Sequence, residues 1–159
     1  MVEVGIAVGS RSDLPVIQKC VETLAEMGIE SEVRVLSAHR TPALTAAWAG
    51  GARERGIKVL IGGAGMAAHL AGALAAHSTL PVIGVPLASG ALNGIDSLLS
   101  TSQMPPGIPV ATVAIGEAGA KNAAYLAAQI IGLTRPEVAA RYQELRDGFV
   151  AAAHALEGQ

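Results

Sequence analysis

Short apolar runs alternate with segments of helical periodicity along the whole of this chain, and this alternation limits the folds open to it. The first run, residues 4–8, has no polar alternation, which is typical of a strand buried on both faces of a sheet. Strands joined by helices run parallel, because each helix carries the chain back across the sheet. We expect strands at residues 4–8, 31–36, 58–61, 81–85 and 110–115, and helices at residues 14–27, 43–55, 67–77, 95–99 and 118–131. Gly28 and Gly56 are the expected ends of the first two helices. The pattern predicts an α/β fold with a parallel sheet.

A final helix is expected at about residues 136–156, and no strand follows it. Val138, Tyr142, Leu145 and Phe149 form an apolar stripe at helical spacing along it. This stripe has to pack either on the chain's own sheet layer or on a neighbouring subunit, and the neighbour is favoured.

The composition also favours association. A chain of 159 residues has the usual size of one domain, so residues 1–159 are expected to form a single domain. Hydrophobic residues make up 51% of the chain and charged residues only 15%. So few charged side chains cover an isolated small domain poorly, and we therefore expect a homo-oligomer.

Several function classes are disfavoured. The formal net charge of −2 and the sequence pI near 6.1 provide no basic field for nucleic acid or for a membrane surface. The start of the chain lacks the basic and apolar regions of a signal peptide, and no apolar run reaches membrane-spanning length without an interruption. Cys20 has no second cysteine to pair with and lies in an apolar helical segment, so it is expected to be a core residue of a cytoplasmic protein.

A histidine and an arginine stand side by side where the second strand gives way to a helix. His39 and Arg40 follow the strand, and Thr41 and Pro42 are good residues for a helix start. Ligands of open α/β sheets bind at such loops, where a histidine can move protons and an arginine can hold an anion. The alternative is that both side chains belong to an ordinary surface turn.

The loop after the first strand, residues 9–15, indicates an anion site. Ser10 and Ser12 offer hydroxyl groups and the following helix offers free N–H groups, whereas Asp13 suits sugar hydroxyls. The loop lacks the glycine and lysine patterns of nucleotide triphosphatases and of dinucleotide sites, which disfavours ATP and NAD. The structural alternative is that Ser12 or Asp13 only caps the helix.

Small residues crowd the loop after the third strand, residues 62–72, and would let backbone approach a flat ligand closely. The alternative is tight strand-to-helix packing by the glycines, with His69 a satisfied first-turn histidine. A further loop, residues 89–94, follows the fourth strand. Because these strand ends share one edge of a parallel sheet, their loops should form a single site. The 4 histidines and the scattered acidic residues show no spacing for zinc or magnesium, so no metal is expected.

Ordered motifs along nearly the whole chain resemble the N5-carboxyaminoimidazole ribonucleotide mutase family, the bacterial class I enzymes. The motifs are Gly9-Ser10-x-Ser12-Asp13, Ser37-Ala38-His39-Arg40-Thr41-Pro42, Ala64-Gly65-x-Ala67-Ala68-His69-Leu70, Asn93-Gly94-x-Asp96-Ser97-Leu98, Gln103-Met104-Pro105 and Lys121-Asn122-Ala123-Ala124. The resemblance implies a three-layer, doubly wound flavodoxin-like sheet with strand order 2-1-3-4-5. It also implies a homo-octamer with active sites at subunit junctions, in which the C-terminal helix packs on neighbouring subunits.

The reaction implied by this resemblance belongs to purine biosynthesis and moves a carboxylate from N5 to C4 of an imidazole ribonucleotide, with no cofactor. His39 matches the family's general acid/base, which removes the C4 proton after CO2 has been released and recaptured. The pathway implies a link to N5-carboxyaminoimidazole ribonucleotide synthetase, which makes the substrate.

The resemblance also assigns the binding residues. Ser10, Ser12, Asp13, Ser37 and Arg40 match residues that bind the ribonucleotide, while Ala64, Gly65, His69 and Leu70 match those that line the pocket for the base and the carboxylate. Met66 and Ala71 depart from the family pattern, where glycine and proline are expected.

Two other functions compete with the mutase. The related class II enzymes carboxylate aminoimidazole ribonucleotide directly with CO2, and a relative could carboxylate another aromatic ring. Class II enzymes usually have His-Lys where this chain has His39-Arg40, so Arg40 favours class I. A non-catalytic mononucleotide-binding module is the alternative from a different class.

Overall fold

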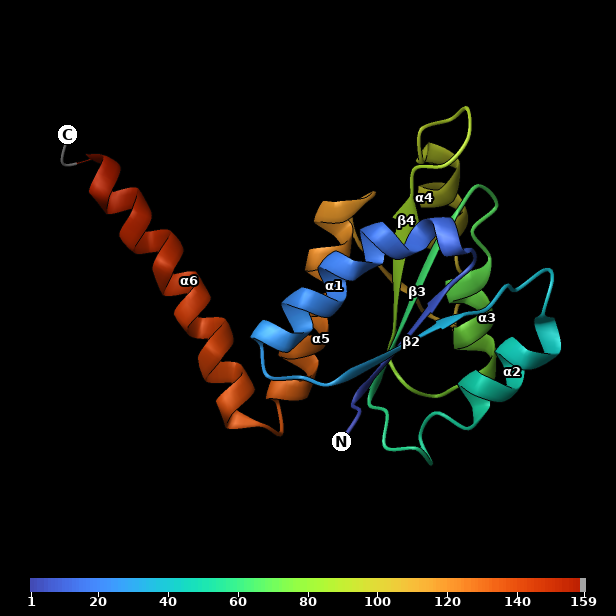
Figure 1. The fold of residues 1–159 in the computed structure, drawn as a ribbon, viewed down its shortest axis with the longest axis horizontal. Helices are drawn as coiled ribbons and strands as arrows, with labels where there is room; N and C mark the ends of the chain where they lie inside the picture. Colours follow the sequence, from blue (N-terminus) through green and yellow to red (C-terminus); the bar gives the residue numbers. More distant parts are fainter. Residues whose placement is uncertain (158–159) are drawn as a thin grey trace.

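The computed structural model describes residues 1–157, and the last two residues of the expected single domain lie outside the described part. Its centre is a five-stranded parallel sheet with the order β2-β1-β3-β4-β5 (Figure 1). The strands are β1 (Val4–Val8), β2 (Ser31–Val35), β3 (Val59–Gly65), β4 (Val82–Leu87) and β5 (Ala111–Thr112). The flavodoxin-like order expected from the sequence is confirmed. The order reverses direction between β1 and β3, and this switch point is where open α/β sheets bind ligands.

Helices cover both faces of the sheet. They are α1 (Leu14–Glu26), α2 (Pro42–Gly50), α3 (Leu70–His77), α4 (Ile95–Ser102), α5 (Glu117–Gly132) and α6 (Pro136–Glu157). α1 and α5 lie side by side over one face, where bulky side chains such as Ile17, Leu24 and Ile131 are buried. α2, α3 and α4 cover the other face, whose core is rich in alanine. α3 approaches the sheet closely at Gly62, which has no side chain. A Cβ at this position would lie only 2.9 Å from the Ala71 Cα atom.

Several expected boundaries are wrong. The strand expected at 58–61 extends to Gly65, and the helix expected at 95–99 extends to Ser102. The helix expected at 43–55 ends at Gly50, and residues 51–56 form turns with hydrogen bonds such as Gly56 N–H to the Arg53 carbonyl. The helix expected at 67–77 begins at Leu70, because Met66 and Ala68 have positive φ angles that no α-helix accepts. The strand expected at 110–115 is only Ala111–Thr112 at the sheet edge. Pro109 before it has no N–H to pair with β4.

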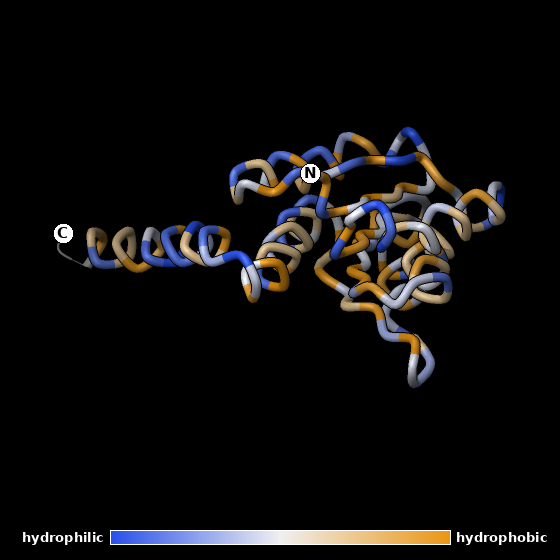
Figure 2. The backbone as a smooth tube through the Cα atoms, turned by 90° about the horizontal axis from the view of Figure 1, so that it is seen from below, coloured by the Kyte–Doolittle hydropathy of each residue, from blue (hydrophilic) through white to orange (hydrophobic). Residues whose placement is uncertain are grey.

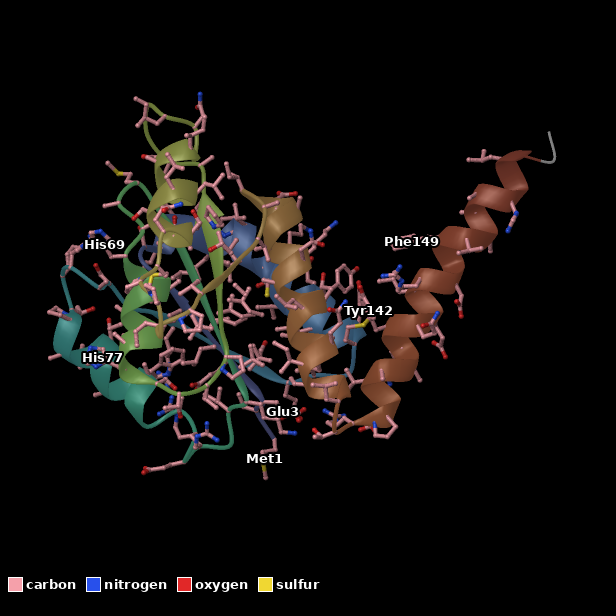
Figure 3. The ribbon with its side chains drawn as sticks, turned by 180° about the vertical axis from the view of Figure 1, so that it is seen from behind. Met1, Glu3, His69, His77, Tyr142 and Phe149 are labelled. Atoms are coloured by element: carbon pink, nitrogen blue, oxygen red, sulfur yellow. The ribbon has the colours of Figure 1, made fainter. Side chains whose placement is uncertain are left out.

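The stripe on α6 is buried at one end and exposed at the other. Val138 is fully buried, and the Tyr142 ring contacts the Tyr125 ring of α5 at a tilt of 47°, with centroids 5.9 Å apart. Farther along, Phe149 is 64% exposed. Figures 1 and 3 show why, since only the first turns of α6 lie against α5 while the rest projects away from the sheet. In Figure 2 this projecting part alternates between hydrophobic and hydrophilic residues.

Cys20 is fully buried, and burial raises the pKa of its thiol to about 12, which fits an unreactive core residue. No helix within residues 1–157 is both long enough and apolar enough to cross a membrane.

Candidate functional site

The loops that follow β1, β2, β3 and β4 meet around one cavity of about 490 Å³ at the carboxyl edge of the sheet. Gly9, Ser10, Ser12, Asp13, Ser37, Ala38, His39, Arg40, Ala64, Gly65, Met66, Ala67, Ala68, His69, Leu70 and Ser89 line it. Figure 3 places His69 at the end of α3 that faces this edge, and His77 at the opposite end of that helix. The convergence of strand-end loops expected from the sequence is therefore present.

Every predicted site residue lies on this cavity, while the chemical roles assigned to them stay predictions. The predicted set omitted several residues that line the cavity, among them Ser89 and Met66. The signal for Ser89 was weak, since it is one serine in a loop of small residues. Its position directly after β4 is the feature that places it at the same edge as the other loops.

The loop after β1 is organised by its serines. Ser10 accepts hydrogen bonds from the Ser12 N–H at 3.3 Å and from the Ser12 hydroxyl at 2.9 Å, and so caps the short 3-10 turn Arg11–Asp13. Asp13 precedes α1, but its side chain makes no capping hydrogen bond. The capping alternative therefore fails for Asp13, whose carboxylate is left for another partner.

Burial raises the pKa of the Asp13 carboxyl above its ordinary value, against the opposing effects of a hydrogen bond from the Ser10 backbone and of the Arg40 charge. A half-buried carboxylate of this kind costs stability unless something binds it. A ligand with hydroxyl groups would supply the missing hydrogen bonds.

The loop after β2 is held at both ends. The Ser37 hydroxyl accepts from the Arg40 N–H at 3.0 Å, and the Ser37 N–H donates to the Thr41 hydroxyl at 2.9 Å. The Arg40 guanidinium donates to the Gly9 carbonyl at 2.9 Å and thereby joins this loop to the loop after β1. Arg40 is exposed, and its remaining N–H groups are free to bind an anion beside Ser10 and Ser12.

His39 and His69 contact each other across the cavity. Their rings meet edge to face with centroids 4.8 Å apart, and His39 Nε2 lies 2.6 Å from His69 Nδ1. At this distance the N–H of one ring donates a hydrogen bond to the nitrogen of the other, so the two tautomers are linked. Both side chains are exposed, which leaves them accessible to a ligand in the cavity.

The loop after β3 is built by close backbone packing. A Cβ on Gly65 would lie 1.7 Å from the Ser89 hydroxyl oxygen, so only glycine fits at this position. The Ser100 hydroxyl of α4 donates to the Ala67 carbonyl, and Ala68 is buried. These contacts form a rigid, apolar wall opposite the polar loops.

The two walls together suit a small organic anion. The polar wall offers hydroxyls, a guanidinium and a carboxylate, the apolar wall offers small side chains and glycine backbone, and the contact between His39 and His69 joins the two walls. Among residues 1–157, no three His, Cys, Asp or Glu side chains are grouped so that they could hold a metal ion.

The chain is similar to characterised proteins over most of its length. The sequence model of the AIR carboxylase family matches residues 3–151. A Vibrio cholerae relative named N5-carboxyaminoimidazole ribonucleotide mutase is 55% identical over 143 residues, covering 90% of this chain and 89% of the relative. A Mycobacterium tuberculosis relative of the same name is 54% identical, covering 91% of this chain and 82% of the relative. The crystal structure of Treponema denticola PurE superposes with a TM-score of 0.87 at 29% identity, covering 98% of this chain and 96% of that one.

Proposed function

Because this chain belongs to the AIR carboxylase family, we propose that it is an enzyme that acts as an N5-carboxyaminoimidazole ribonucleotide mutase in purine biosynthesis. It would move the carboxylate of its substrate from N5 to C4 of the imidazole ring. The relatives from Vibrio cholerae and Mycobacterium tuberculosis carry this activity in their names. Arg40 beside His39 also matches the class I pattern rather than the His-Lys pattern of class II.

The observation that carries the proposal is the position of His39. It lies between a polar wall suited to a ribonucleotide and an apolar wall suited to an imidazole and its carboxylate, within 2.6 Å of His69. Arg40 with Ser10 and Ser12 would bind the phosphate, and Asp13 would accept hydrogen bonds from the ribose. Ser37 would also bind the ribonucleotide, and its hydroxyl, which accepts from the Arg40 N–H, would hold the loop that carries His39 and Arg40.

The reaction needs one proton delivered and one removed. When the bond between N5 and the carboxylate carbon breaks, its electron pair stays on N5, CO2 is released, and His39 supplies a proton to N5. C4 then attacks the carbon of the same CO2, and His39 takes the proton from C4. The histidine ends as it began, so no oxidant, reductant or second substrate is required.

His69 would serve His39 as well as the substrate. Its Nδ1 is within hydrogen-bond distance of His39 Nε2, so it can hold the His39 ring in one orientation between the two proton transfers. Ala64, Gly65 and Leu70 would form the surface against which the base and CO2 lie. A closely packed wall keeps the two reacting fragments together, which raises their effective concentration.

A spectrophotometric assay tests the proposal with wild type, His39→Asn and a matched control, His77→Asn. His77 is an exposed histidine at the far end of α3, outside the cavity. Each protein receives freshly made N5-carboxyaminoimidazole ribonucleotide in one cuvette, and aminoimidazole ribonucleotide with excess bicarbonate in another. We expect turnover of the N5-carboxy compound by wild type and by His77→Asn, and a loss of about 10²- to 10⁴-fold in His39→Asn.

The other outcomes separate the competing functions. Turnover only of aminoimidazole ribonucleotide with bicarbonate would identify a direct carboxylase. No turnover by wild type with either compound, together with tight binding of the ribonucleotide, would identify a binding module.

We also propose that the projecting part of α6 packs on further copies of the chain in a cytoplasmic homo-octamer, with the cavity at a subunit junction. Phe149, Val150 and Leu156 expose 64%, 56% and 74% of their surfaces on a helix that its own sheet does not cover. Sedimentation should give an octamer for wild type and smaller species for Phe149→Asp, whereas a wild-type monomer would refute the proposal. The substrate would come from N5-carboxyaminoimidazole ribonucleotide synthetase.

A further inference from the structure

Met66 stands at the opening of the cavity. Met66 lines the cavity, and 61% of its surface is exposed. Its side chain therefore lies between the interior of the site and solvent. Its neighbours along the loop are Gly65 and Ala67, which form part of the apolar wall. The proposed reaction gives this long apolar side chain no chemical role.

The backbone at Met66 is in an unfavourable conformation that its surroundings impose. Its φ of 55° lies in the left-handed region, which residues with a side chain seldom adopt. Gly65 is packed against Ser89 on one side, and the Ala67 carbonyl accepts from the Ser100 hydroxyl on the other. The loop is therefore fixed at both sides of Met66, and the direction of the side chain follows from the fixed backbone.

The side chain reaches the loop that follows β4. A Cβ on Gly90 would lie 3.7 Å from Met66 Cγ, which is ordinary van der Waals contact. Gly90 has no side chain to fill this space, and its φ of +85° disfavours any residue that has one. Both loops lie at the same end of the sheet (Figure 1), so Met66 belongs to one of them and lies against Gly90 of the other.

We propose that Met66 is a gate residue that retains CO2 in the site between its release from N5 and its capture by C4. This inference rests on the proposed mutase activity. CO2 is small, uncharged and unable to donate a hydrogen bond, so the polar groups of the site hold it weakly. A flexible apolar thioether across the opening slows its escape without binding it. Met66 thus determines what fraction of the CO2 released from N5 is captured by C4 before it escapes to solvent.

The test measures the origin of the product carboxylate. Wild type, Met66→Gly, Met66→Ala and Met66→Leu convert unlabelled N5-carboxyaminoimidazole ribonucleotide in a buffer that contains ¹³C-bicarbonate. Mass spectrometry gives the ¹³C fraction of the C4 carboxylate at early times, corrected for a blank without enzyme. We expect the ¹³C fraction and the free aminoimidazole ribonucleotide to be several-fold higher for Met66→Gly and Met66→Ala than for wild type.

Met66→Leu is the matched control, because it keeps most of the apolar bulk and should give the wild-type isotope fraction. Met66→Ala separates the side chain from the backbone, since glycine also relaxes the left-handed conformation and alanine does not. An unchanged ¹³C fraction in the glycine and alanine variants would overturn the gate, as would an equal rise in all three variants. If wild type gives no C4-carboxylated product from the N5-carboxy compound, the proposed function itself has failed.

Discussion

The two walls of the cavity are built in different ways. The polar wall, formed by the loops after β1 and β2, is held by side-chain hydrogen bonds such as Ser12 to Ser10 and Arg40 to the Gly9 carbonyl. The apolar wall, formed by the loop after β3, is held by backbone packing in which Gly65 touches Ser89. One wall presents groups that bind charge, and the other presents a surface of fixed shape.

This difference predicts what each wall tolerates. A hydrogen-bonded loop can adjust when a methyl group is added, because its side chains rotate. The loop at Gly65 can adjust less, because an added Cβ would meet the Ser89 Cβ and the Leu87 carbonyl oxygen, which no side-chain rotation moves away. Substitutions should therefore damage the polar wall through lost binding and the apolar wall through lost shape.

The largest effect is expected for Gly65→Ala, with Gly9→Ala in the polar wall as its control. Rotation of the Ser89 hydroxyl would relieve the 1.7 Å clash, but the new Cβ would still lie 3.0 Å from Ser89 Cβ and 3.1 Å from the Leu87 carbonyl oxygen. We expect a loss of about 2 to 3 kcal/mol in the free energy of unfolding, measured with a denaturant.

Gly9→Ala should change the free energy of unfolding by less than about 0.5 kcal/mol. The Cβ it adds would meet only Asp13 Oδ2, at 3.8 Å. Equal destabilisation by the two alanines would remove the distinction between the walls.

A moderate effect is expected for Arg40→Lys. Lysine keeps the charge but lacks the planar fork of N–H groups, so it cannot both donate to the Gly9 carbonyl and bind phosphate in the same geometry. We expect KM for the ribonucleotide to rise about tenfold, or about 1.4 kcal/mol, with a smaller change in kcat. Arg34→Lys on the exposed edge strand is the control. An unchanged KM for Arg40→Lys would show that Arg40 does not bind the phosphate and only joins the two loops.

The smallest effect is expected for Asp13→Asn, measured as thermal stability against pH. The pKa of the Asp13 carboxyl is raised in the folded chain, so burial of its charged form costs stability at neutral pH. Asparagine should therefore raise Tm at pH 7. The corresponding gain in the free energy of unfolding should be less than about 1 kcal/mol. The gain should fade as pH falls through the raised pKa toward the ordinary value of 3.8.

Glu144→Gln, at an exposed position on α6, should leave Tm unchanged at each pH and serves as the control. A lower Tm for Asp13→Asn at pH 7 would show that the carboxylate has a stabilising partner in the fold.

Part of the fold follows from local sequence. The strand expected at residues 4–8 has those bounds in the structure, and Gly28, at a φ of +74°, follows the end of α1 as expected. An apolar run or a glycine at a helix end determines the conformation of only a few neighbouring residues, so these features can be predicted from the sequence. The helix expected from residue 67 is wrong because Ala68 has a positive φ, in a loop that contacts the distant residues Ser89 and Ser100.

The site shows the same division. Each loop could be predicted, because a strand and a helix start flank it in the sequence. The contact between His39 and His69 joins residues that are 30 positions apart, and it depends on the pairing of β1 with both β2 and β3. Ser89 lies in the space that the missing side chain of Gly65 leaves open, and this contact between distant residues is visible only in the structure.

The sequence by itself determined the parallel α/β fold and the loops that carry chemistry, because periodicity and turn residues encode local structure. Family resemblance added the strand order. Only the tertiary structure decided that His39 faces His69, that Met66 lies against Gly90, and that α6 leaves Phe149 uncovered. Each of these depends on how segments far apart in the chain pack together, and side-chain volume and backbone clashes fix that packing in three dimensions.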